Sequence, residues 1–146
     1  YDVPCILHTY WKAALELGHD AIHLPLPLLR ELSAKSQNYL QSQNSTISQS
    51  FHVTDFHKIG TSVHSVEDAM EAERLGAAYV TAGHIFTTDC KKGLPPRGLD
   101  FLKNFCDAVT IPVYGIGGIK GGPHLWNKLK KQGACGGCIM SGMMQL

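Results

Sequence analysis

The chain alternates between two kinds of segment along almost its whole length, and this alternation restricts its fold more than any other feature. Short apolar runs typical of buried strands occur at residues 4–8, 21–24, 58–64, 77–86, 111–116 and 137–141. Helix-like stretches separate them, at residues 11–17, 28–40, 66–75, 99–109 and 123–132. Regular alternation of this kind predicts an α/β fold in which parallel strands are joined by crossover helices.

The helix expected at 66–75 has the clearest limits. Ser65 and Asp68 have the spacing of a capping box, and Gly76 can adopt the left-handed conformation that ends a helix. The pattern also places the apolar residues Val66, Ala69, Met70 and Leu75 on roughly one face of this helix.

Composition limits the class of protein. A chain of 146 residues with 44% hydrophobic content can form one domain with a core, and its net charge of +1 does not indicate a nucleic-acid partner. It contains no apolar run near the ~18 residues that span a bilayer, and no secretory signal. We therefore expect a single cytoplasmic domain over residues 1–146 without a membrane partner. Because the chain starts at Tyr1 rather than Met, an upstream portion is expected.

The cysteines and histidines do not predict a metal site or a cofactor. The five cysteines are odd in number and lie mostly in apolar surroundings, which favours reduced thiols over disulfides. Cys135 and Cys138 form a single C-x-x-C motif without the second ligand pair that a structural zinc needs. The spacing of His8, His23, His52 and His57 is not that of metal ligands, and the polar tract 41–50 is interpreted as a surface loop without an assigned function.

Repeated strand–helix units can build either an open doubly wound sheet or a closed barrel. A glycine-rich turn after the first strand would favour the open dinucleotide-binding fold, but residues 7–10 contain no glycine. The paired Gly117 and Gly118 come late instead, after the strand at 111–116. Because (β/α)8 barrels commonly bind phosphate at such late loops, we predict a TIM-barrel type of fold.

One segment combines a titratable group with a suitable position. His84 follows the apolar run 77–82 and should emerge at the carboxyl end of a strand, where α/β proteins place their chemistry. An imidazole with an ordinary pKa of ~6.5 can both remove and return a proton near neutral pH. Together with the glycine pair, whose N–H groups can approach an anion, this predicts proton transfer on a small phosphorylated substrate.

Several segments together resemble the thiamine phosphate synthase/TenI family over nearly the whole chain. They are residues 59–65, 67–76, 83–94, 116–119 and 140–142. The resemblance implies an eight-stranded barrel, of which this chain would supply about six strands. Because His84 follows Gly83, the segment resembles the thiazole tautomerase branch, which implies an isomerase that aromatises a thiazole carboxylate phosphate with His84 as acid–base residue.

The chain departs from the synthase branch of this family at two places. In the synthase, acidic residues after two strands hold a pyrimidine diphosphate and its magnesium, and here the matching positions are 8–9 and 25–28, without a carboxylate. Magnesium prefers hard oxygen ligands. This difference argues against the coupling reaction of the synthase.

The resemblance also implies a set of binding residues. Gly117, Gly118 and Ser141 would hold the phosphate, and the structural alternative for them is a tight turn and a capped strand end. Asp89 would be tolerable beside a phosphate only if it turned away or paired with Lys92 or Arg97. The remaining candidates for substrate contact are Ser62, Thr88, Asp89, Cys90, Lys91 and Met140.

Three functions therefore stand at this point. The first is a thiazole tautomerase-like isomerase that acts on a small phosphorylated thiazole without cofactor or metal. The second is a non-catalytic phosphate-ligand-binding or regulatory protein, and the third is a thiamine-phosphate synthase. Six strands of an eight-stranded barrel would leave two open edges, so we also expect a homo-oligomer.

Overall fold

The computed structural model describes residues 3–41, 55–140 and 143. Six strands form one sheet: β1 (Leu7–His8), β2 (Ala21–Pro25), β3 (Lys58–Val63), β4 (Tyr79–Gly83), β5 (Val113–Ile116) and β6 (Gly136–Cys138). The helices are α1 (Trp11–Glu16), α2 (Leu26–Gln41), α3 (Val66–Arg74), α4 (Gly98–Ala108) and α5 (Pro123–Lys131), with a short 3-10 helix, η2, at Asp89–Lys91.

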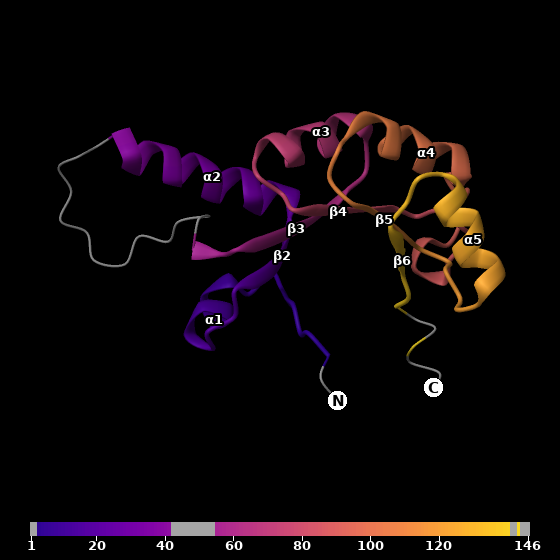
Figure 1. Ribbon diagram of the computed structural model, residues 1–146, viewed down its shortest axis with the longest axis horizontal. Helices are drawn as coiled ribbons and strands as arrows, with labels where there is room; N and C mark the ends of the chain where they lie inside the picture. The colour runs from indigo at the N-terminus through magenta and orange to yellow at the C-terminus, as the bar shows by residue number, and fades with distance from the viewer. Residues whose placement is uncertain (1–2, 42–54, 141–142, 144–146) are drawn as a thin grey trace.

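The strands lie in the sheet in the order in which they occur in the chain, and every pair is parallel. A doubly wound sheet would reverse direction at a switch point, and this order has none. Crossovers of one hand that always move to the next strand curve the sheet steadily, with the helices on its outer side (Figure 1). The result is a half-barrel, which confirms the predicted fold class.

The core lies between the outer face of the sheet and the helices. Alternate strand residues such as Ile22, Leu24 and Val80 are fully buried there and meet apolar residues of the helices. The largest fully buried helical side chains are Leu29, Leu102, Phe105 and Leu129. The parallel register keeps these alternate positions in line from strand to strand, so a continuous apolar layer fixes the curvature of the sheet.

The other face of the sheet, which we call the inner face, is polar and aromatic. Its side chains alternate along the strands with those of the apolar core: His8, His23, Ser62, Tyr79, Thr81, Tyr114 and Cys138. Among them, His23 and Thr81 are themselves buried. The helices thus pack on one face only, and the inner face is available for interactions of its own.

Helix α3 shows both what the local sequence determined and what it did not. The Asp68 N–H donates to Ser65 Oγ at 3.1 Å, and Gly76 has a φ of 88°, so the predicted cap and stop are confirmed. The apolar face of the helix is only partly buried, since Met70 is 54% exposed. Ala72 is buried in its place, because the small Ala69 and Ala72 side chains let the helix approach the sheet.

Five further expectations need correction or lie outside the described residues. The first strand is only Leu7–His8, and the fourth ends at Gly83. Beyond Gly83, the Ile85 N–H still donates to the Ile116 carbonyl at 2.9 Å, and the Phe86 N–H donates to the Gly117 carbonyl at 3.0 Å. Most of the cysteines were predicted to lie in apolar surroundings, but Cys5, Cys90 and Cys135 are exposed to solvent. The expected loop at 41–50 falls almost wholly, and Ser141 wholly, outside the described residues.

Candidate functional site

A small cavity lies where β4 and β5 end. Its volume is about 20 Å³, and Thr88, Ile116, Gly117, Gly118, Ile119, Cys138 and Met140 line it. Four of the residues predicted from the sequence therefore come together here: Thr88, Gly117, Gly118 and Met140. The cavity sits at the carboxyl edge of the parallel sheet, where barrel proteins bind their ligands.

The turn at Gly117 and Gly118 requires glycine for two reasons. Both residues have positive φ angles, 94° and 68°, which side chains rarely tolerate. A Cβ on Gly117 would also lie 2.4 Å from the His84 Cβ, and one on Gly118 would lie 2.4 Å from the Thr87 carbonyl oxygen. The loop after β4 therefore packs directly on this turn, and the absence of both side chains is what lets the two segments meet.

Two hydrogen-bond donors at the cavity have no acceptor among the described residues. No acceptor among the described residues takes the N–H group of Gly118. The Thr88 hydroxyl precedes η2 at its N-cap position but makes no capping hydrogen bond. Backbone N–H groups and hydroxyls with free donors at the edge of a parallel sheet are suited to an anion.

His84 adjoins this cavity without lining it. Its backbone follows Gly83 at the end of β4, and its carbonyl oxygen accepts a hydrogen bond from the Arg97 N–H at 3.2 Å. The Nε2 atom of its ring is buried and has no hydrogen-bond partner among the described residues. A buried polar atom without a partner costs free energy, so this nitrogen is a candidate for contact with a bound group.

The loop residues Asp89, Cys90 and Lys91 do not reach the cavity. They form η2, and all three are exposed. No ion pair between Asp89 and Lys92 or Arg97 is found in the described part of the chain. The Arg97 guanidinium instead donates to the His64 carbonyl and lies 4.7 Å from the centre of the Phe101 ring.

The inner face of the sheet carries a connected set of hydrogen bonds across β2, β3 and β4. His23 contacts Tyr79 through Nδ1, 3.1 Å from the hydroxyl, and Ser62 through Nε2, 2.9 Å from Oγ. Ser62 Oγ in turn lies 3.0 Å from Thr81 Oγ1. A neutral imidazole donates at one nitrogen and accepts at the other, so the protonated ring nitrogen determines which hydroxyls donate along this chain.

Burial and a neighbouring imidazole hold His23 in its neutral form. The His8 ring stacks on it, with centroids 4.9 Å apart and planes at 24°. Burial, and secondarily the charge of His8, lower the pKa of His23 from 6.5 to about 4. At neutral pH the network therefore contains a neutral His23, which orients the hydroxyl groups of Tyr79 and Ser62.

Sequence reasoning missed this network except for Ser62. His23 was set aside because its spacing to other histidines resembles no metal site, and Tyr79 was counted only as part of an apolar run. The register pairs Ser62 with Thr81, and Gly60 with both His23 and Tyr79, across three strands. Alternation within each predicted strand was the one signal that could have placed these residues on a common face.

Two kinds of site are not found in the described part of the chain. Among these residues no group of three or more histidine, cysteine or acidic side chains is placed to hold a metal ion. Nor does any described helix combine the length and apolar character needed to cross a lipid bilayer.

Comparison with known proteins identifies the family. A family model described as thiamine monophosphate synthase matches residues 1–143. The chain belongs to the thiamine monophosphate synthase/TenI family. It is 34% identical to a thiamine-phosphate synthase of Clostridium acetobutylicum over 99% of this chain and 60% of that protein. It is also 38% identical to the thiamine-phosphate synthase of Listeria monocytogenes, over 82% of this chain and 50% of that one.

A solved structure agrees with this family. The thiamine phosphate pyrophosphorylase of Pyrococcus furiosus superposes with a TM-score of 0.70 at 27% identity, covering 100% of this chain and 61% of that one. Nearly all of this chain thus matches these two relatives, and the match spans about three fifths of the length of each.

These relatives overturn the predicted branch of the family. The sequence segment around His84 was interpreted as that of a thiazole tautomerase, and the curated relatives are instead named thiamine-phosphate synthase. The isomerase assignment is therefore wrong. The Gly83–His84 pair alone was too short a motif to determine the activity, because one fold can host different chemistries.

Proposed function

We propose that this chain contributes the part of a thiamine-phosphate synthase that binds the phosphorylated thiazole. In the reaction concerned, a thiazole phosphate is coupled with a pyrimidine diphosphate. The names of the relatives support this reaction. The observation that carries the proposal for this chain is the glycine turn, which lines the cavity together with Thr88 and whose Gly118 N–H has no acceptor among the described residues.

The geometry favours a phosphate at the cavity and the thiazole toward the inner face. The Gly118 N–H and the Thr88 hydroxyl would donate to phosphate oxygens. A cavity of about 20 Å³ holds roughly one water molecule. The larger phosphate therefore requires a rim side chain to move, and Met140, 60% exposed, is the least constrained one.

His84 and Ser62 would contact the rest of the substrate. The unpartnered Nε2 of His84 offers a hydrogen bond from beside the turn. Ser62 offers a hydroxyl whose direction is set by His23 and Thr81. Asp89, Cys90 and Lys91 are assigned a secondary role, since binding would have to draw their exposed loop toward the cavity.

The residues described do not fit the magnesium that the synthase resemblance implies. The ends of β1 and β2 carry His8, Thr9, Pro25 and Leu26, where a hard cation would require oxygen ligands such as carboxylates. The proposal for this chain is therefore confined to binding and orienting the phosphorylated thiazole.

Binding of thiazole phosphate to the 146-residue chain, measured by isothermal titration calorimetry, tests the proposal. Thr88→Glu places a carboxylate at the cavity, so we expect affinity to fall at least about tenfold through charge repulsion. Thr87→Glu is the matched control, because its side chain is exposed and does not line the cavity. Equal affinities of the two variants, or no binding by the parent chain, would refute the proposed site.

One observation keeps a second function open. The lack of fit to magnesium favours a phosphate-ligand-binding protein that does not catalyse the coupling. Supplying the chain with both substrates separates the two functions. Thiazole phosphate binding with formation of thiamine phosphate supports the synthase, whereas binding without product supports the non-catalytic alternative.

A further inference from the structure

Helix α5 presents a group of cationic and polar side chains away from the cavity described above. An open groove of about 500 Å³ is lined by His124, Asn127, Lys128, Lys130 and Lys131, all from this helix. All five are exposed, while Leu129 on the opposite side is fully buried in the core. The helix is therefore held firmly by its apolar side and leaves its cationic side to solvent.

The lysines of this groove have no internal counter-charge. No acidic residue occurs in α5, and none of the ion pairs in the described part of the chain includes Lys128, Lys130 or Lys131. Asp107 of the adjacent helix α4 pairs with Lys103, and Asp68 and Glu71 of α3 pair with Arg30. The positive charge is thus local and uncompensated in a chain whose net charge is only +1.

The helix dipole explains only part of this arrangement. Cations in the last turn are favourable near the negative end of a helix, which accounts for positive charge at Lys128, Lys130 and Lys131. It does not account for the position of His124, which lies in the first turn. Nor does it remove the repulsion between Lys128 and Lys131, which are neighbours three residues apart on the helix surface.

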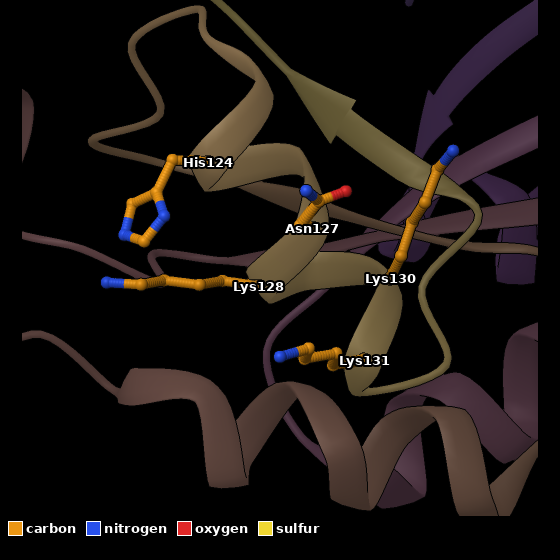
Figure 2. Close-up of a pocket in the computed structure, with 5 residues that line it drawn as sticks. All are labelled: His124, Asn127, Lys128, Lys130 and Lys131. Atoms are coloured by element: carbon orange, nitrogen blue, oxygen red, sulfur yellow. The ribbon is translucent and has the colours of Figure 1, made fainter.

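Three of the cationic or titratable side chains, His124, Lys128 and Lys131, lie on one side of α5 (Figure 2). Figure 2 shows the His124 ring and the Lys128 ammonium group on the same side of α5, with Lys131 one turn further along and Lys130 directed to the other side. Residues three and four apart on a helix lie roughly 5–6 Å from each other. The cluster therefore matches a compact anion with charges a few ångströms apart, and it lacks the extended stripe that a nucleic acid requires.

We propose that this α5 groove binds a diphosphate group, with the ammonium groups of Lys128 and Lys131 facing its two phosphates. The His124 ring and the Asn127 amide supply hydrogen bonds beside them. A groove of this volume is within the range of small-molecule sites. The diphosphate would also relieve the repulsion between the two lysines, which nothing within the described chain offsets. This second anion site is independent of the phosphate cavity.

Calorimetric titration of the 146-residue chain with inorganic diphosphate, at low ionic strength, tests this site. Carrying Thr88→Glu in every protein suppresses the phosphate cavity. Lys128→Gln combined with Lys131→Gln should then weaken binding at least about tenfold. The control Lys35→Gln removes the same kind of charge from α2, where Lys35 pairs with Glu31, and should change affinity less than about twofold.

A parallel titration with adenosine diphosphate identifies the source of the diphosphate. Tighter binding of inorganic diphosphate would assign the free anion, and tighter binding of the nucleotide would assign a diphosphate ester. Affinity should fall as salt is added in either case. The proposal is overturned if Thr88→Glu alone abolishes binding, if the double lysine variant binds as well as its parent, or if a DNA oligonucleotide binds more tightly than both diphosphates.

Discussion

Acidification should destabilise the half-barrel through His23. Its pKa is about 4 in the folded chain and 6.5 without the fold, so the unfolded chain binds more protons between these values. Stability contributed by the neutral imidazole is therefore fully present above pH 6.5 and is lost as the pH falls toward 4. The complete difference corresponds to roughly 3 kcal/mol, and we expect about 2 kcal/mol because part of the ring remains in contact with solvent.

Urea denaturation of the chain and of His23→Gln, from about pH 7.5 to about pH 4.5, measures this effect. Glutamine retains a donor and an acceptor for Tyr79 and Ser62 but does not titrate. The wild-type advantage in free energy of unfolding over His23→Gln should shrink by about 2 kcal/mol across this range. Taking the difference between the two proteins cancels the titration of Glu71 and Glu73, whose pKa values are lowered by hydrogen bonds from Arg30 and Thr110, respectively.

His57→Gln is the matched control, because His57 is an exposed histidine. It should follow the wild-type pH dependence. If the difference in free energy of unfolding between the wild type and His23→Gln were the same at every pH, His23 would have the same pKa in the folded and unfolded chain. That result would refute the argument from the burial of His23 and its stacking on His8.

Two further predictions concern the inner face and the sheet edges. Gly60→Ala should lower the free energy of unfolding, measured by urea denaturation, by about 1–3 kcal/mol, because the added Cβ would lie 2.0 Å from the Tyr79 ring and displace the Tyr79 hydroxyl from His23. Gly121→Ala is the control, because its Cβ would lie 3.6 Å from the nearest atom. Equal stability of the two variants would contradict the close contact of Gly60 with Tyr79. Within the described residues, β1 and β6 each pair with another strand on one side only. Light scattering should therefore show self-association, and hydrogen exchange should be fast in both strands. A monomer with slow exchange in β1 and β6 would count against open sheet edges.

Gly118→Asp is not a suitable test of the phosphate turn, although it would place a negative charge there. Its φ of 68° and the 2.4 Å approach to the Thr87 carbonyl mean that any side chain strains the fold. Loss of binding in that variant would therefore not distinguish an anion site from local unfolding, whereas Thr88→Glu leaves the turn intact.

Local patterns were sufficient for the elements and their order. The period of apolar residues located six strands and five helices to within a few residues, because each strand has to bury one face against a helix whatever its neighbours are. Ser65 and Gly76 marked the limits of α3 for the same reason, since a cap and a left-handed stop depend on residues adjacent in the chain.

The site required the tertiary structure. The Gly117–Gly118 turn was predicted to bind phosphate from its residues, but only the fold shows that Thr88 and Met140 share its cavity while Asp89, Cys90 and Lys91 remain outside. Loop conformation depends on what packs beneath the loop, here the contact of the glycine turn with His84 and Thr87.

The inner-face network marks the limit of what the sequence determines by itself. His23 and Ser62 are 39 residues apart, and their 2.9 Å contact exists only because the parallel register places Pro25 beside Ser62 and His23 beside Gly60. Amino-acid sequence determined that these strands form and which of their faces is apolar. The curvature and register of the sheet decided which polar residues meet on the opposite face, because they set the distances between residues remote in the chain. The neutral state of His23 beside His8 follows from that arrangement.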